Sequence, residues 1–327
     1  MSQAPRIWVL MGHRRGDNNQ LLALAEGLGL PFETRTVEYR WMSRVRWKIF
    51  RSSAGHLKPA SRRWLEPPWP DLVIGIGQRT VSVARWIRKQ SGGRTRLVRL
   101  GHPRAPNRLF DLVITTRQYP VPTGANVLTL PLAMNRFRAA PEPTADEQAW
   151  LDAKPRPHLL LSLGGTAPMW QLDIAALRDA AGRLAKRAAK TGGTLIVVGS
   201  PRTPSEAYDV IPNAPNVAIA DKDVRYPVLL ADGDEHFVTA DSVSMISEAV
   251  VTGKPVGLIP VEPDARGRRR LGPDPNRTKI RDPRRFWAAV QADGLVGTVE
   301  EPKRGNFEEP VETAVAAVKR ALSGLFE

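Results

Sequence analysis

A chain of 327 residues is too long for one ordinary hydrophobic core, and it suits two domains of about 150 residues each. Its 48 Lys and Arg residues against 33 Asp and Glu leave a formal charge of +15, which favours an anionic partner such as a phosphate, an acidic lipid headgroup or nucleic acid. The chain has no cysteine, which excludes disulfides, thiolate catalysis and Cys-ligated zinc.

The chain carries no recognisable targeting or membrane-spanning pattern. Its first apolar run, Ile7–Met11, is short, and positive charge follows it at Arg14 and Arg15, whereas a signal peptide carries the charge first. No stretch approaches the roughly 18 continuous apolar residues that a membrane span requires. We therefore expect a cytoplasmic protein, or one that is peripheral on the inner face of a membrane.

Short apolar runs alternate with helical patterns along the first part of the chain. Runs rich in Val and Ile that are separated by helices are typical of a parallel sheet wound by helices. The strands expected here are Ile7–Gly12, Phe32–Val37, Asp71–Gly77, Arg96–Gly101, Asp111–Thr115 and Asn126–Leu130. The clearest helices are Asp17–Leu28 and Arg79–Lys89.

The same alternation restarts after a proline-rich stretch, residues 136–157, which we expect to be a linker. The expected strands of the second series are His158–Gly164, Thr194–Gly199, Val217–Ala220, His236–Ala240 and Pro255–Ile259, with helices Leu172–Lys190 and Ser242–Thr252. The sequence thus predicts two Rossmann-like, doubly wound α/β domains, residues 1–135 and 158–308, that face a cleft. A last helix in residues 309–327 has an apolar stripe and could return to the N-terminal domain.

The strongest local pattern is Thr239–Glu248, where a strand runs into a helix. Asp241 or Ser242 suits the N-cap, and the free backbone N–H groups at a helix start attract phosphate. Ser242 and Ser244 add hydroxyl groups, and Glu248 follows where a carboxylate can accept from both hydroxyls of a ribose. The alternative is an ordinary capped helix with a solvent-facing Glu.

Two more strand ends in the same domain have residues that suit a diphosphate. Gly164 and Gly165, followed by Thr166, would let backbone N–H groups approach it closely, although a tight turn gives the same pattern. Ser200 and Arg202 follow the next strand, and Arg202 could pair with phosphate or remain a solvated surface residue. Because all three segments follow strands of one sheet, they predict one donor site.

The N-terminal domain has candidates for the acceptor side. A general base is expected in the segment of Gly12, His13, Gly16, Asp17 and Gln20, with Asp17 or His13 as the base. Asp17 is equally well placed to be a helix N-cap.

Other strand ends of this domain add Gln78, Arg79 and His102 to the acceptor side. The segment around Gln78 fails as a dinucleotide fingerprint, because Thr80 stands at the third glycine position. We expect no metal and no cofactor beyond the donor: Asp232-Gly-Asp234 precedes a strand and suits a turn, and five scattered histidines lack ligand spacing.

A basic insert rich in tryptophan, Arg40–Trp69, follows the second expected strand. Indole rings interleaved with Arg and Lys suit an anionic membrane surface or a lipid-linked acceptor. The alternative is a helix that packs its apolar side chains on the domain while its Arg residues stay solvated. Nucleic acid is an unlikely partner, because no recognised binding motif accompanies the charge. A second basic run, Arg266–Arg270, suggests an exposed loop.

The segment Ser247–Pro255 resembles the Ser-Glu-x4-Gly-x-Pro stretch of GT-B enzymes that build the peptidoglycan lipid intermediate, in which the Glu holds the nucleotide ribose. A wider resemblance is carried by five segments: Gly16–Gln20, Pro70–Arg79, Gly101–Arg104, Leu161–Gly165 and Asp241–Glu248. Through them the chain resembles, nearly end to end, the family named after the plant "elongated mitochondria" fission protein, which has many bacterial members. The resemblance implies a GT-B-like fold.

These observations lead to two hypotheses about function. One is a metal-independent glycosyltransferase that moves a sugar from a nucleotide diphosphate donor to a lipid or glycolipid acceptor at the cytosolic face of a membrane. The other is a non-catalytic, GT-B-shaped adaptor at a membrane, which the name of the fission family suggests.

Overall fold

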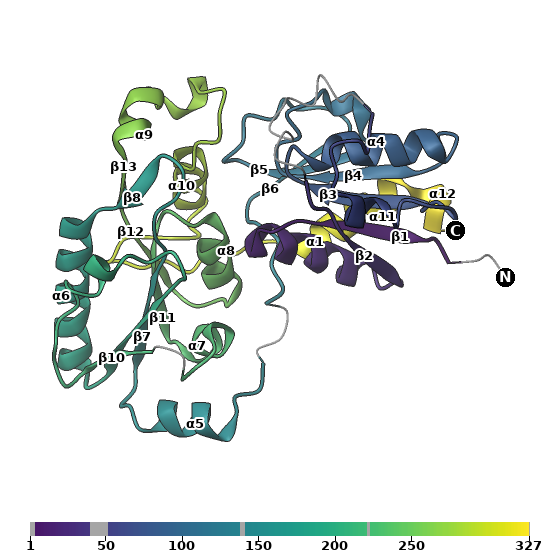
Figure 1. The fold of residues 1–327 in the computed structure, drawn as a ribbon. Helices are drawn as coiled ribbons and strands as arrows, with labels where there is room; N and C mark the ends of the chain where they lie inside the picture. Colours follow the sequence, from purple (N-terminus) through teal and green to yellow (C-terminus); the bar gives the residue numbers. More distant parts are fainter. Residues whose placement is uncertain (1–3, 40–51, 138–140, 221–222, 327) are drawn as a thin grey trace. The chain divides into compact units, whose positions relative to one another are not determined.

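The computed structural model describes residues 4–39, 52–137, 141–220 and 223–326. The chain divides into two compact units, each with its own sheet (Figure 1). Unit 1 consists of residues Met1–Arg136 together with Glu308–Glu327, and unit 2 consists of Phe137–Phe307.

Unit 1 is built on a six-stranded parallel sheet in the order β2-β1-β3-β4-β5-β6. Its strands are β1 (Ile7–Met11), β2 (Phe32–Thr36), β3 (Leu72–Ile76), β4 (Arg96–Leu100), β5 (Leu112–Thr116) and β6 (Val127–Leu130). Ile7 of β1 pairs with Phe32 on one side and with Leu72 on the other, so β1 and β3 are neighbours at the point where the strand order reverses.

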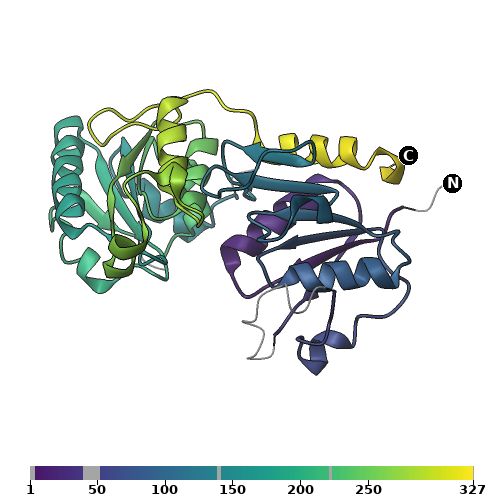
Figure 2. The same cartoon turned by 90° about the horizontal axis from the view of Figure 1, so that it is seen from above.

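Helices cover both faces of this sheet because the side chains of its strands alternate. Ile7 and Val9 of β1 pack with helices α1 (Arg15–Gly27) and α11 (Pro310–Ala321), whereas Trp8 and Leu10 pack on the side of α4 (Thr80–Gln90). The C-terminal helix α11 thus completes the core of unit 1, and in Figure 2 it is drawn in yellow beside the sheet. The described part of unit 1 also contains helices α3 (Pro59–Arg62) and α12 (Ser323–Phe326).

Unit 2 is built on a five-stranded parallel sheet in the order β10-β9-β7-β11-β12, so β7 and β11 flank its reversal point. Its strands are β7 (His158–Leu163), β9 (Thr194–Gly199), β10 (Val217–Ile219), β11 (Glu235–Thr239) and β12 (Val256–Ile259). A small antiparallel pair joins β8 (Trp170–Leu172) to β13 (Val261–Pro263).

The helices of unit 2 again lie on both faces of the sheet. Helix α6 (Ile174–Thr191) packs its Leu and Ala side chains on one face, while α7 (Tyr226–Asp232) and α8 (Val243–Val251) lie on the other (Figure 1). Among its described residues, unit 2 also has helices α5 (Ala145–Asp152), α9 (Ala265–Arg270) and α10 (Arg284–Ala292).

The fold class predicted from the sequence is confirmed, with two corrections of detail. The stretch expected as a linker contains α5, whose N-cap Thr144 and Glu147 form a reciprocal capping box. The basic run Arg266–Arg270 lies in α9 and not in a loop, because the Asp264 side chain caps the helix by accepting from the Gly267 N–H. As expected, Asp232 and Asp234 flank a turn, between α7 and β11.

The tryptophans at the end of the basic insert belong to the core of unit 1. The rings of Trp64 and Trp69 pack edge-on against buried Trp8, with centroids 5.7 and 6.2 Å away. Both are half-buried against this core, and contact of the insert with a membrane or lipid stays a prediction. The rest of the basic, aromatic run, residues 40–51, lies outside the described residues.

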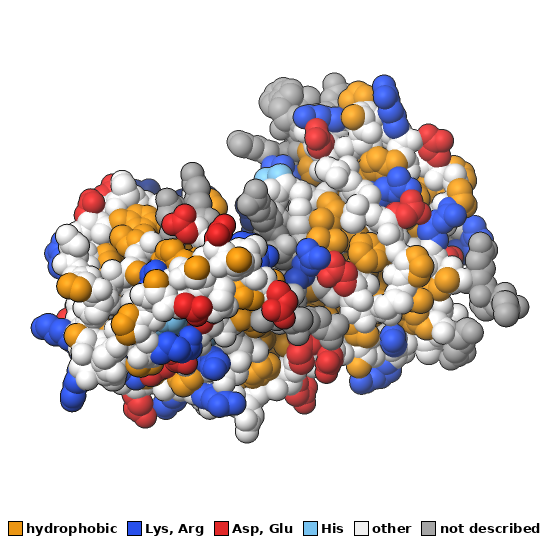
Figure 3. Space-filling model, turned by 90° about the horizontal axis from the view of Figure 1, so that it is seen from below, with side chains coloured by type: hydrophobic (Ala, Val, Ile, Leu, Met, Phe, Trp, Pro, Cys, Tyr) orange, Lys and Arg blue, Asp and Glu red, His pale blue; other side chains and the backbone are white. Residues whose placement is uncertain are grey.

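On the face drawn in Figure 3, Lys and Arg side chains are interspersed with Asp, Glu and apolar groups on both units. The net charge is therefore not gathered into one patch there. Within the described ranges, no helix combines the length and the apolar character that crossing a membrane demands.

Candidate functional site

In unit 2, the predicted donor residues converge at the reversal point of the sheet. In an open α/β sheet, ligands bind outside the carboxyl ends of the strands at this point. Here β7 ends at Leu163 and β11 at Thr239. The Gly164 N–H donates to the Thr239 hydroxyl at 2.7 Å, which in turn donates to Asp241 at 2.8 Å, so the two strand ends are linked directly.

The glycine pair has a different role from the one expected. The Gly165 N–H donates to Asp241 Oδ2 at 3.0 Å, so both glycine amides are already engaged within the protein and do not face a ligand in this structure. A Cβ at Gly164 would overlap the Asp241 carboxylate, and a Cβ at Gly165 would overlap the Arg202 carbonyl oxygen. The glycines are therefore needed for close packing of three strand ends.

The end of β9 joins the same cluster. The Ser200 hydroxyl donates to the Gly164 carbonyl at 3.0 Å, and Thr203 also donates to that carbonyl. The Arg202 guanidinium donates to the carbonyl of exposed Thr166 at 3.2 Å. Because the Arg202 side chain is 46% exposed, it can turn toward an anion at the strand ends.

Asp241 is the buried centre of the cluster. Its side chain is fully buried, and burial raises the pKa of the carboxyl above its usual range. The bonds from Gly165 and Thr239 oppose this shift, as does Arg202, whose guanidinium is 3.5 Å away. Asp241 therefore organises the strand ends rather than capping the helix.

Helix α8 carries the groups that remain available. Ser242 is its N-cap and accepts from the Met245 N–H at 3.4 Å, and Ser244 is half-buried in the first turn. The first N–H groups of a helix have no partner within it, so they can bind a phosphate together with the hydroxyl of Ser244.

Glu248 lies further along α8 and is half-buried. Burial raises the pKa of its carboxyl to about 7. Neither a hydrogen bond nor an ion pair reaches this carboxylate from the described residues. It is close enough to Tyr226 that, besides burial, its charge raises the pKa of that phenol. A half-buried carboxylate of this kind is suited to accepting hydrogen bonds from a ligand.

In unit 1, the predicted acceptor-side residues also follow neighbouring strands. After β1, the loop is closed by Asn18, whose side chain accepts from the Gly12 N–H at 2.9 Å and donates to the Gly12 carbonyl at 2.8 Å. Helix α1 begins at Arg15, so Asp17 lies in its first turn and is not the N-cap that was considered. The other predicted residues of this segment are exposed His13, exposed Gly16 and half-buried Gln20.

A buried arginine that the sequence analysis did not single out lies among these strand ends. Arg99 of β4 is 2% exposed, and its guanidinium donates to Thr80 and to the Gly77 carbonyl. Burial lowers its pKa to about 10, and the nearby groups that oppose this shift include Tyr39 and Asp17. An Arg at the end of a strand usually faces solvent, so no sequence pattern indicates that Arg99 is buried.

The remaining predicted residues of unit 1 follow strand β3 or strand β4, and Arg99 belongs to β4. Gln78 and Arg79 follow β3, and the guanidinium of exposed Arg79 lies over the Tyr39 ring. His102 follows β4, accepts from the Arg104 N–H at 2.8 Å, and has a pKa lowered mainly by burial. Its ring contacts Tyr119 edge-on.

Two parallel, doubly wound units in one chain, with polar clusters at their strand ends, define a protein of the GT-B fold class. The fold is similar to that of the UDP-GlcNAc 2-epimerase from Neisseria meningitidis bound to UDP-GlcNAc, with a TM-score of 0.53, 13% identity and coverage of 98% of this chain and 100% of that one. The chain belongs to the mitochondrial fission ELM1 family, whose model matches residues 15–275.

Two relatives illustrate the range of this family. The mitochondrial fission protein ELM1 of Arabidopsis thaliana is 30% identical over 230 residues, 61% of this chain and 53% of the plant protein, so the chain spans about half the length of that relative. An uncharacterized protein of Rickettsia prowazekii is 24% identical over 296 residues, which are 76% of this chain and 82% of that protein.

Proposed function

We propose that unit 2 binds a nucleotide diphosphate sugar at the reversal point between β7 and β11. The observation that carries this proposal is the half-buried Glu248 carboxylate, free of protein partners among the described residues, on the helix that begins beside Asp241. The diphosphate would lie at the start of α8, within reach of Ser244 and Arg202, and the ribose hydroxyls would donate to Glu248. The epimerase with the similar fold was solved with UDP-GlcNAc, which supports the ligand class.

We further propose that the protein transfers the sugar to a lipid or glycolipid acceptor without a metal ion. The leaving diphosphate gains negative charge as the glycosidic bond breaks, and the helix start with Arg202 would stabilise that charge. Asp17 or His13 of unit 1 would accept the proton of the attacking hydroxyl. His13 is exposed. Asp17 lies close enough to Arg99 that its negative charge acts to raise the pKa of that guanidinium.

Thermal denaturation with a panel of UDP, GDP and CMP nucleotides and their sugars tests the donor site. A ligand that binds only the folded protein raises the melting temperature. We expect one member of the panel to do so for the wild-type protein and much less for Glu248→Gln. No shift with any member at millimolar concentration would refute the proposal. Incubation with the nucleotide sugar that binds, followed by detection of free nucleoside diphosphate, then tests for transfer or hydrolysis.

A non-catalytic adaptor is the second candidate, and one observation favours it. The amides of Gly164 and Gly165, which a diphosphate would use, are already bonded to Thr239 and Asp241. A protein that keeps the fold, but whose glycine amides are bonded within the protein, would still present surfaces to a partner at a membrane. Release of nucleoside diphosphate by the wild-type protein, lost in Glu248→Gln, would count against this candidate.

A further inference from the structure

Two hydroxyl groups are buried beside the proposed donor site, and neither has a hydrogen-bond partner among the described residues. They belong to Ser162 of β7, which is fully buried, and to Tyr226 of α7, whose ring is half-buried while its oxygen is shielded from solvent. A buried hydroxyl without a partner costs free energy, because it has lost its hydrogen bonds to water. Two such groups at one place therefore indicate a role other than stability.

The order of the elements brings both hydroxyls to the same end of the sheet. The side chains before and after Ser162 in β7 pack on the α6 side, so Ser162 faces the side of α7 and α8 (Figure 1). Helix α7 runs antiparallel to β7, because Asp232 at its C-terminal end accepts from His158 at the start of β7, at 2.6 Å. Tyr226 is the first residue of α7 and therefore lies beside the end of β7, next to Ser162.

Glu248 of α8 is the third member of this group. It lies four residues after Ser244, so the two side chains are on the same side of the helix. Burial raises the pKa of the Tyr226 phenol above its usual range, the charge of Glu248 raises it further, and the Ser162 hydroxyl opposes the shift. Both groups are thus close to the phenol, which keeps its proton at neutral pH and can donate a hydrogen bond.

The three groups can form one chain of hydrogen bonds with a ribose. Ionised Glu248 accepts from the ribose hydroxyls, and a hydroxyl that donates to Glu248 still has lone pairs with which it can accept from Tyr226. The Tyr226 oxygen can in turn accept from the neighbouring Ser162 hydroxyl. Every donor in this chain points toward the carboxylate, so each bond strengthens the next. A bound ribose would therefore satisfy all three groups at once.

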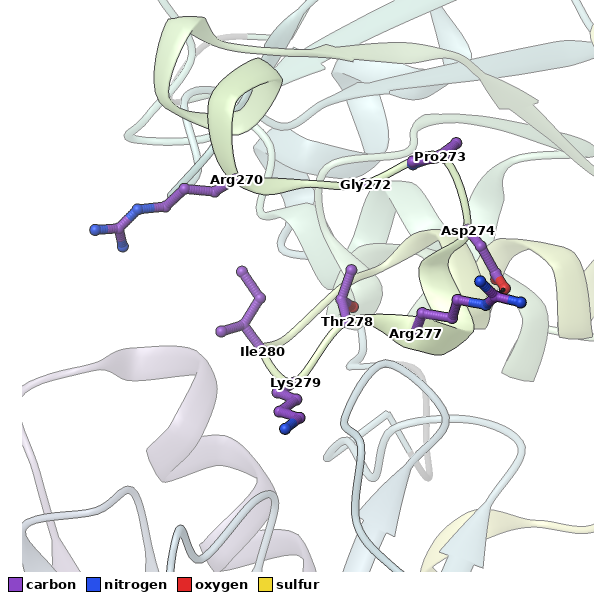
Figure 4. Close-up of a pocket in the computed structure, with 8 residues that line it drawn as sticks. All are labelled: Arg270, Gly272, Pro273, Asp274, Arg277, Thr278, Lys279 and Ile280. Carbon is purple, nitrogen blue, oxygen red and sulfur yellow. Dashed lines mark ion pairs between the residues drawn. The ribbon is translucent and has the colours of Figure 1, made fainter.

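The cavity between α9 and α10 does not offer groups that converge in this way. It has a volume of about 590 Å³ and is lined by residues between Arg270 and Ile280. In Figure 4 the side chains of Arg270 and Lys279 leave it in different directions, so one small ligand does not contact both. By contrast, the groups beside Glu248 come from a strand and two helices that pack together.

We propose that Tyr226 binds a hydroxyl of the nucleotide ribose and that Ser162 positions its phenol, so that unit 2 selects ribonucleotides against deoxyribonucleotides. The proposal rests on the proposed donor site and adds two residues that the sequence pattern around Glu248 does not indicate. Glu248 accepts from the sugar, whereas Tyr226 needs an oxygen that accepts from it. A deoxyribose without that oxygen would leave the phenol buried and unpaired, and such a mismatch is a strong basis for discrimination.

Unfolding of the ligand-free protein separates this role from a structural one. Tyr226→Phe and Ser162→Ala each remove a buried hydroxyl without a partner among the described residues, so each should leave the melting temperature unchanged or raise it by about 1–3 °C. The matched control is Thr194→Val, because the Thr194 hydroxyl is also buried but donates to the Pro155 carbonyl at 2.8 Å. This control should lower the melting temperature by about 2–4 °C. A fall of that size in Tyr226→Phe would assign its hydroxyl to the fold and overturn the proposal.

Calorimetric titration tests the contact with ribose. The probes are the UDP, GDP or CMP sugar that gives the largest thermal shift and its 2′-deoxy and 3′-deoxy counterparts. Tyr226→Phe should bind the ribose form at least about fivefold more weakly than wild type, and Thr194→Val should differ from wild type by less than about twofold. One of the two deoxy forms should bind Tyr226→Phe and wild type alike, because the hydroxyl that Tyr226 contacts is missing from it. An equal loss with all three probes would overturn the assignment to ribose.

The same titrations test Ser162 and distinguish the two proposals. Ser162→Ala should weaken binding in the wild-type background and have no further effect in Tyr226→Phe, because it acts through the phenol; an undiminished effect there would overturn its positioning role. If no nucleotide sugar binds the wild-type protein, the donor site is refuted and the ribose contact with it. If one binds and Glu248→Gln weakens it, but Tyr226→Phe binds as wild type does, the donor site stands and the role of Tyr226 is overturned.

Discussion

The raised pKa of Glu248, about 7, makes nucleotide binding depend on pH in a way that can be calculated. A carboxylate that accepts from two ribose hydroxyls must be ionised, so the apparent affinity should follow its ionised fraction. That fraction is about 0.9 one unit above the pKa and about 0.1 one unit below it. The dissociation constant should therefore rise about tenfold between about pH 8 and about pH 6, which is about 1.4 kcal/mol of binding free energy.

Isothermal titration across this pH range, with the nucleotide sugar that gives the largest thermal shift, measures the effect. A nucleotide sugar is preferred to a free nucleoside diphosphate, because a terminal phosphate itself titrates near about pH 6. Glu248→Gln is the matched control, since it keeps the size of the side chain and cannot ionise. It should bind about tenfold more weakly than wild type at the upper end of the range, with no dependence on pH.

An affinity of the wild-type protein that does not change with pH would refute the reasoning. The same pH dependence of affinity in Glu248→Gln as in the wild-type protein would also refute it. A second readout comes from the same titrations. Because binding selects the ionised form of a half-ionised group, about half a proton should be released per ligand near pH 7. Comparison of buffers with different ionisation enthalpies measures this proton directly.

Three further predictions concern stability and are checked by urea or thermal unfolding. Gly164→Ala should destabilise unit 2 by about 1–3 kcal/mol, because its Cβ overlaps a buried carboxylate, whereas Gly182→Ala, with open space at the Cβ, should be neutral or slightly stabilising. Burial lowers the pKa of His158, but the bond to Asp232 raises it, and the net shift is upward. The pair should therefore stabilise the fold fully below the pKa of His158 in the unfolded chain, and this contribution should be lost as the pH rises through the pKa in the folded protein. Asp232→Asn should abolish this pH dependence of stability. Burial lowers the pKa of His236 to about 4, so stability should fall by about 3 kcal/mol as pH drops from about 6.5 to about 4, and His236→Leu should not show this loss.

The parallel strands were predictable because they are continuous apolar runs that end at turn residues. Thr194–Gly199 is such a run, and the structure has a strand with the same bounds. The strands of the pair β8 and β13 are only three residues each, too short to show any period. The run of arginines in α9 has no apolar face, so its pattern predicts a loop, whereas the Asp264 side chain caps the segment as a helix.

It was also predictable which residues of the candidate site lie together, but not which hydrogen bonds their atoms form. Parallel strands place their ends on one edge, so Gly164, Arg202 and Asp241 had to be neighbours. Whether the Gly165 N–H faces a ligand or the protein depends on where the Asp241 carboxylate lies, and the sequence pattern does not specify this position. Likewise, nothing in the pattern of β4 indicates that Arg99 turns inward to Thr80 and the Gly77 carbonyl.

Unit 1 is assembled from two stretches that are far apart in the sequence, and this has a consequence for synthesis. Its core needs Val311 and Val318 of α11, which leave the ribosome only after all of unit 2 has been made. Unit 2 is continuous and can fold as it emerges, whereas the first 136 residues must wait with an unfinished apolar face. A chain that lacks α11 would therefore expose this apolar face of unit 1, the kind of surface that chaperones and proteases recognise.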